Sequence, residues 1–149
     1  MNTVVHESSI HIDAPVRTVF QHIQDPHHWH DALPESHRKG NRVGDITRTP
    51  DGRVSGYAFM GDLGPFTLRV HLTREEEIAD RRIVDHSQAG PIYTYTLTPD
   101  GAGTTLELRF TITSTVPGMA RVRDAIAWSG GDEDIDVMLR HYKQAIEGA

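Results

Sequence analysis

The chain has 149 residues, which suits a single domain over residues 1–149, and its formal net charge of −6 argues against broad binding to nucleic acid or anionic membranes. It contains no cysteine, which excludes disulfides and thiolate metal sites and leads us to expect a reducing, cytoplasmic location. No apolar run approaches the roughly 18 residues of a membrane span, so we expect no membrane insertion.

The first part of the chain predicts a strand followed by a short helix. Residues Val4 to Ile12 read as a strand that places His6 and Ser8 on the same side as Ile10 and Ile12. Asp13-Ala14-Pro15 is typical of a helix start, with a carboxylate able to cap and a proline tolerated in the first turn. The apolar face of this helix recurs at helical spacing and consists of Val16, Val19, Phe20 and Ile23.

A second short helix is expected after Asp25, which is its predicted cap, and Pro34 ends it. Its apolar face consists of Trp29, Ala32 and Leu33. The histidines around Trp29 are His27, His28, His30 and His37. His27 with His30 or Asp31 has the spacing of a helical metal pair, but no H-E-x-x-H motif or distant carboxylate accompanies it. We therefore expect a solvated helix face and no metal.

From Glu35 to Thr115 the pattern becomes strand and turn, and it predicts about seven strands in total. The turn signals are Gly40-Asn41, Pro50-Asp51-Gly52, Leu63-Gly64-Pro65, Ala89-Gly90-Pro91 and Pro99-Asp100-Gly101. The clearest strand runs from Thr104 to Thr113, where Leu106, Leu108, Phe110 and Ile112 alternate with polar residues. This alternation is typical of a half-buried antiparallel strand.

The chain ends in a predicted amphipathic helix from Asp132 to Glu147. Its apolar stripe consists of Ile135, Met138, Leu139, Tyr142 and Ile146. Because most of the preceding chain reads as strand, this stripe needs a sheet to bury it. Met119, Val122 and Ile126 predict a further helix that breaks or kinks at Gly130-Gly131. The sequence leaves open whether that break is a hinge.

A strand, two short helices opened by Asp-Ala-Pro, several antiparallel strands and a long closing helix resemble the helix-grip fold of the START/Bet v 1-like (SRPBCC) superfamily. The resemblance rests on Ser9 to Pro15, on Val19-Phe20 and on Asp25 to Trp29, and it extends over essentially the whole chain. It implies an α+β fold in which a curved antiparallel sheet, two short helices and a long C-terminal helix enclose a cavity.

Within that superfamily the chain looks most like the polyketide cyclase/dehydrase branch. The D-x-x-x-W pattern from Asp25 to Trp29 and the Gly90-Pro91 pair before an aromatic-rich strand are similar to those proteins. The resemblance implies a hydrophobic, aromatic or polyketide-derived ligand and cofactor-free cyclisation or dehydration. Relatives with this fold also act as carriers, sensors or sequestering proteins without chemistry, so the fold does not decide the function.

Aromatic and apolar residues on the predicted inner faces are the candidate ligand contacts. Trp29 walls the cavity mouth and stacks on a flat ligand, or it is an ordinary core tryptophan. Tyr93 and Tyr95 share a strand face, and the Tyr93 hydroxyl is a candidate to polarise a ligand carbonyl. The other candidate ligand contacts are Tyr57, Phe110, Met138 and Tyr142.

Three further residues are catalytic candidates. His6 is an acid or base if it faces inward, or a structurally satisfied strand histidine. The Asp85 side chain points to the same face of the strand as Ile83 and to the opposite face from His86. Asp85 is therefore either an inward-facing base or a carboxylate that is only hydrogen-bonded. The alternation around Arg69 and His71 predicts that both face solvent, and the opposite register would place them in the pocket. Cyclases of the resembling branch use an inward arginine, which makes Arg69 the candidate for that role.

The sequence thus favours an enzyme that confines a flexible substrate chain in its cavity and polarises the carbonyl groups of that substrate. The alternative is a non-catalytic carrier, sensor or self-resistance protein for the same class of molecule. A regulator that binds a protein partner through the exposed sheet face is less favoured. A monomer and a homodimer are both compatible with the sequence.

Overall fold

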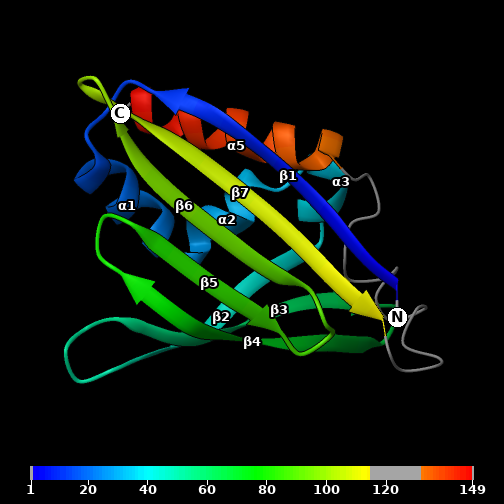
Figure 1. Ribbon diagram of the computed structural model, residues 1–149. Helices are drawn as coiled ribbons and strands as arrows, with labels where there is room; N and C mark the ends of the chain where they lie inside the picture. The colour runs from blue at the N-terminus through cyan, green and yellow to red at the C-terminus, as the bar shows by residue number, and fades with distance from the viewer. Residues whose placement is uncertain (1, 115–131, 149) are drawn as a thin grey trace.

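The computed structural model of the protein describes residues 2–114 and 132–148 (Figure 1). The helix predicted around Met119, Val122 and Ile126, and the break at Gly130-Gly131, lie outside these residues.

Seven strands form one antiparallel sheet, which confirms the predicted number and direction. In chain order they are β1 (Asn2–Ile12), β2 (Asn41–Arg48), β3 (Val54–Leu63), β4 (Phe66–Ile78), β5 (Arg82–Ser87), β6 (Ile92–Asp100) and β7 (Gly103–Ser114). Their spatial order is β1-β7-β6-β5-β4-β3-β2. Tight turns join β3 to β4 and β6 to β7, and there Gly64 (φ 61°) and Gly101 (φ 62°) adopt the left-handed conformation that glycine tolerates best.

The described helices are α1 (Val16–Gln24), α2 (Pro26–Ala32), α3 (Glu35–Arg38) and α5 (Asp132–Glu147). Asp25 caps α2 by accepting a hydrogen bond from the backbone N–H of His27 at 2.9 Å, which confirms its predicted role. The expectation of a carboxylate cap on α1 is wrong, because Pro15 is the capping residue and no side chain bonds there. The short helix α3 was not expected, since its segment reads as strand and turn.

Helix α5 packs its apolar stripe against the sheet and is accompanied on that side by α1 and α2 (Figure 1). All five predicted stripe residues are buried, with exposed fractions between 0% and 7%. They belong to the same core cluster as the inward residues of β7, which are Leu106, Leu108, Phe110 and Ile112. A helix with one apolar stripe and strands with period-two alternation therefore bury each other, as their patterns predict. None of the helices in the described ranges is both long enough and apolar enough to cross a membrane.

Candidate functional site

Five inward side chains lie in one row across the sheet, each opposite the next on its neighbouring strand. The register pairs His6 with Phe110, Phe110 with Tyr93, Tyr93 with Asp85, and Asp85 with Arg74. The rings of His6 and Phe110 are stacked with centroids 6.2 Å apart, and those of Phe110 and Tyr93 meet edge to face at 5.2 Å. Three of the residues predicted to be catalytic thus come from separate strands and share one line on the inner face.

Trp29 of α2 closes over this face and is the centre of an aromatic cluster. Its ring meets Tyr57 at 5.8 Å, Phe59 at 5.4 Å and Tyr93 at 5.6 Å, in each case edge to face. This geometry is the favourable one for aromatic pairs because ring edges and ring faces carry opposite partial charge. Trp29 is only 6% exposed, so it is a buried wall residue.

A cavity of about 20 Å³ lies beside Trp29, between α2 and the inward residues of β3, β4, β5 and β6. Its apolar walls include Phe59, Leu72 and Tyr93, and Ser87 supplies a hydroxyl. The Ser87 oxygen already accepts a hydrogen bond from the backbone N–H of Ala89 at 3.2 Å. An apolar hollow with a few polar groups is the chemistry of a site for a small hydrophobic molecule.

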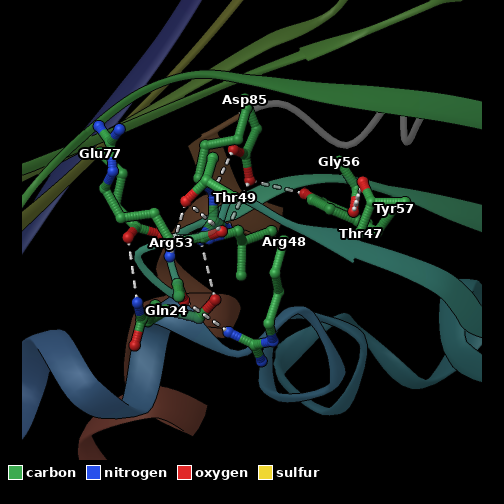
Figure 2. Close-up of polar contacts among 12 residues, drawn as sticks. Gln24, Thr47, Arg48, Thr49, Arg53, Gly56, Tyr57, Glu77 and Asp85 are labelled. Atoms are coloured by element: carbon green, nitrogen blue, oxygen red, sulfur yellow. Dashed lines mark hydrogen bonds and ion pairs between the residues drawn. The ribbon is translucent and has the colours of Figure 1, made fainter.

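Arg74 and Asp85 form a buried ion pair at the polar end of the row. The Arg74 Nε and Nη2 atoms donate to the two Asp85 carboxylate oxygens at 2.8 and 3.2 Å. The Tyr57 hydroxyl donates to the same carboxylate at 2.7 Å (Figure 2). Burial, reinforced by the Asp85 charge, raises the pKa of Tyr57 well above its ordinary value. Tyr57 therefore stays neutral and is held as a donor.

The Arg74 guanidinium also connects the sheet to α1 through hydrogen bonds. Arg74 Nη1 donates to Glu77 at 2.8 Å and to the backbone carbonyl of Gln24 at 2.9 Å. The Gln24 side-chain amide donates to the second Glu77 oxygen at 3.0 Å (Figure 2). Burial lowers the pKa of Arg74, but the hydrogen bonds and charge of Asp85, together with Tyr57 and Glu77, outweigh this effect, and the net shift is upward. The network is thus charged, buried and internally satisfied.

Tyr95 and Tyr142 join the sheet to α5 through their hydroxyls, which lie 3.0 Å apart. Both side chains are buried, which confirms that both face inward. Burial raises the pKa of each phenol above its ordinary value. Met138 and Phe110 are also fully buried, so every residue predicted as a ligand contact belongs to the interior.

The structure corrects two of the catalytic candidates. Arg69 faces outward as its alternation predicts, is 61% exposed along its side chain and pairs with Asp45 at 2.7 Å, so a pocket role for Arg69 is wrong. His71 is likewise exposed, which rules out the opposite register. Asp85 faces inward as expected, but its carboxylate is occupied by Arg74 and Tyr57, so it is not an unpaired base.

Arg74 is the inward arginine that the sequence reading missed. The alternation of Leu68, Val70 and Leu72 on β4 continues directly to Arg74, so the same period that places Arg69 outside places Arg74 inside. Its burial was unexpected because an arginine is rarely fully buried unless it is paired.

The histidines around α2 make local hydrogen bonds. The His30 Nε2 atom lies 2.7 Å from the backbone carbonyl of Asn41, and the His141 Nδ1 atom lies 2.9 Å from that of Ala32. His27 lies 3.0 Å from the Asp25 carboxylate and is exposed. Within residues 2–114 and 132–148, no group of three or more histidines, cysteines or carboxylates is arranged to hold a metal ion.

His22 and His28 form a parallel stacked pair between α1 and α2, with ring centroids 3.8 Å apart. The edge of Tyr142 meets His22 at 6.0 Å. Burial and then the neighbouring His28 lower the pKa of His22 to about 4, against the opposing influence of Asp25 and Asp31. His22 is therefore neutral in the folded protein at neutral pH.

We expect acid to destabilise the protein through His22. Its folded pKa of about 4 lies below the ordinary value of 6.5, so the unfolded chain binds the proton more readily. The stability that the folded protein gains from holding His22 neutral is fully present above pH 6.5 and is lost progressively as the pH falls toward 4. The loss should be about 1–2 kcal/mol, because water partly screens a half-buried ring. Urea unfolding at several pH values should show a shallower pH slope for His22→Phe, and an unchanged slope would contradict the assignment.

Comparisons with known proteins agree with this architecture. The model of a protein family described as "Polyketide cyclase / dehydrase and lipid transport" matches residues 3–147 of the chain. Among curated proteins, no sequence matches the chain significantly.

Several solved structures share the fold. A START superfamily protein from Mycobacterium smegmatis has a TM-score of 0.68 at 12% identity, with 97% of each chain covered. The Zhui aromatase/cyclase from Streptomyces sp. R1128 has a TM-score of 0.67 at 14% identity, covering 98% of this chain and 94% of that one. The di-domain protein StfQ of the steffimycin biosynthetic pathway has a TM-score of 0.65 at 15% identity, covering 98% of this chain and 52% of that one. At these identities the likeness shows the helix-grip fold of the START/Bet v 1 superfamily.

Proposed function

Because the chain belongs to the polyketide cyclase/dehydrase and lipid transport family, we propose that it binds a hydrophobic, aromatic or polyketide-derived small molecule and promotes its cyclisation or dehydration without a cofactor. The observation that carries this proposal is the aromatic cluster centred on Trp29, three of whose rings, those of Trp29, Phe59 and Tyr93, line a cavity. Edge-to-face rings on several sides of a hollow favour a flat, apolar ligand.

His6 and Tyr93 are the residues we assign to chemistry. They lie on either side of Phe110 in the cross-strand row, and Tyr93 also lines the cavity beside Trp29. An imidazole suits proton transfer near neutral pH, and a phenol hydroxyl can donate to a carbonyl oxygen. Asp85 is reassigned from base to positioning residue, because it orients the Tyr57 hydroxyl and neutralises Arg74.

The proposed reaction is an intramolecular aldol closure followed by loss of water. His6 removes a proton from a carbon next to one carbonyl, and the resulting enolate carbon bonds to a second carbonyl carbon. The oxygen of that second carbonyl, polarised by Tyr93, takes up a proton and later leaves as water together with an adjacent carbon-bound proton. Oxidation states balance across the two steps, so neither an oxidant nor a reductant is consumed. Holding the two carbons close supplies much of the rate.

The test is turnover of an aryl-substituted diketone that closes to an aryl cyclohexenone and releases water. We expect His6→Ala to lower turnover about 100-fold and Tyr93→Phe about 10-fold, the range for loss of acid–base or hydrogen-bonding groups. Affinity for the closed product should change less than about threefold, since the apolar walls remain. Product formation is followed by absorbance and affinity by calorimetry. Equal losses of turnover and affinity would remove the case for both catalytic groups.

A non-catalytic carrier is the second candidate. The observation that favours it is the pairing of Asp85 with Arg74 and Tyr57, which takes the one inward carboxylate of the row out of acid–base chemistry. A carrier would bind the aryl cyclohexenone with the same affinity in wild type, His6→Ala and Tyr93→Phe, and none of the three would convert the diketone. Mass spectrometry of the protein purified from its own host would then find an unaltered small molecule bound one to one.

A further inference from the structure

Trp29 carries an unsatisfied hydrogen-bond donor. Its indole Nε1 atom is buried and has no hydrogen-bond partner among the residues that the structure describes. An indole N–H can only donate, so it cannot be satisfied by a neighbouring donor. A buried donor left without an acceptor costs about 1–3 kcal/mol. Trp29, which also lines the cavity, therefore carries a buried group that favours an oxygen acceptor.

Tyr95 and Tyr142 add a second donor to this interior. Their hydroxyls lie 3.0 Å apart, and a pair of hydroxyls uses only one of its two protons in the mutual bond. Over the described residues, no other side-chain partner accompanies either hydroxyl. One hydroxyl proton of the pair thus remains available to donate.

The charged groups of the interior are already matched to one another. The Asp85 carboxylate accepts from Arg74 and Tyr57, and Glu77 accepts from Arg74 and Gln24. Arg74 also donates to the carbonyl of Gln24, so all three nitrogens of its guanidinium are already bonded within the protein. A carboxylate or phosphate placed here would have to break this buried network. The matched charges favour a neutral ligand, and the Trp29 N–H without a partner among the described residues favours one with an acceptor oxygen.

We infer that the Trp29 indole N–H is a specificity-determining donor that binds a neutral carbonyl oxygen of the ligand. The inference rests on the proposed function and adds the contact that selects the ligand. The cavity of about 20 Å³ that Trp29 lines has room for one oxygen-sized group. Trp29 thus selects by hydrogen bonding, in addition to stacking as an aromatic wall.

The experiment compares tetralone with tetralin, which has the same bicyclic carbon frame without the carbonyl. In wild type, tetralone should shift the Trp29 Nε1–H resonance downfield and slow its exchange with water, and tetralin should do neither. The second tryptophan of the chain is Trp128, so the resonance is assigned by its absence from Trp29→Phe. The Kd of tetralone should rise about tenfold in Trp29→Phe, the loss expected for one buried hydrogen bond. The Kd of tetralin should change less than about threefold, because phenylalanine keeps an aromatic wall.

Each alternative outcome separates this inference from the proposed function. Equal changes for both probes in Trp29→Phe, or an unmoved Nε1–H resonance with tetralone bound, would overturn the donor role and leave aromatic binding intact. Failure of wild type to bind either probe at millimolar concentration would overturn both proposals. If Trp29→Phe does not fold, the wild-type resonance decides alone, assigned instead by its persistence in Trp128→Phe. His27→Ala, at an exposed position of the same helix, is the matched control: both Kd values and the Nε1–H shift with tetralone should stay as in wild type.

Discussion

Arg74→Met is expected to lower the free energy of unfolding by about 3–5 kcal/mol, because removing one partner of a buried ion pair leaves the other charge uncompensated. Arg74 has two such partners, Asp85 at 2.8 Å and Glu77 at 2.8 Å, and the three side chains are between 2% and 4% exposed. Methionine keeps the apolar stem and removes the guanidinium. The loss of unfolding free energy therefore measures the cost of leaving two carboxylates buried without their cation and of breaking the hydrogen bond to the Gln24 carbonyl.

Urea unfolding measures this loss, and Arg69→Met is the matched control. Arg69 lies on the same strand, but its side chain is 61% exposed and pairs with Asp45 at the surface, so its removal should cost no more than about 1 kcal/mol. A combined Arg74→Met, Asp85→Asn and Glu77→Gln variant should regain part of the stability, since no buried charge is then left unpaired. Similar losses for Arg74→Met and Arg69→Met would show that the buried network does not contribute as its geometry indicates.

Trp29→Ala is expected to cost about 3–5 kcal/mol, the range for removing a buried aromatic side chain from a packed core. The loss has a clear source, since the ring meets Tyr57, Phe59 and Tyr93 at centroid distances between 5.4 and 5.8 Å. Trp29→Phe should cost much less, because it keeps an aromatic ring and removes a buried donor that has no partner in the described part of the chain.

Thermal and urea unfolding of both variants test this difference, with His27→Ala as the control on the same helix. The His27 side chain is 59% exposed, so its loss should stay within about 1 kcal/mol. Trp29→Ala should also weaken the binding of tetralone and of tetralin. Full stability in Trp29→Ala would mean that the aromatic cluster is not part of the packed core, and unchanged affinity for both probes would remove Trp29 from the site.

The positions of the core residues could be predicted from the sequence because they follow from local periodicity. Period two places Leu106, Leu108 and Phe110 on the inner face of β7, and helical spacing places Met138 and Tyr142 on the buried stripe of α5. The same reasoning places Arg69 outside, and it would have placed Arg74 inside had it been carried two residues beyond Leu72. Of the two predicted helix caps, the one on α2 is confirmed, because Asp25 caps it, and the one on α1 is wrong, because no side chain caps that helix.

The partners of the buried charges could not be predicted in this way. Alternation gives the side of the sheet on which a residue lies, but not the residue that faces it on the next strand. That register depends on turn geometry and on shifts such as the one between Arg74 and Glu76, where β4 and β5 pair irregularly. The offset brings Asp85 and Glu77 to the same guanidinium, and it turns Asp85 from a candidate base into half of an ion pair.

Local periodicity in the sequence thus determined the main helices, the strands and their inward faces, and the resemblance carried by Ser9 to Pro15 and Asp25 to Trp29 indicated the helix-grip architecture. Only the tertiary structure decided which inward groups meet. It aligned His6, Phe110, Tyr93, Asp85 and Arg74 in one row, satisfied the charged members, and left the Trp29 donor without an acceptor among the described residues. The physical reason is that hydrogen bonds and ion pairs act over a few ångströms, so their satisfaction depends on long-range register that no local pattern encodes.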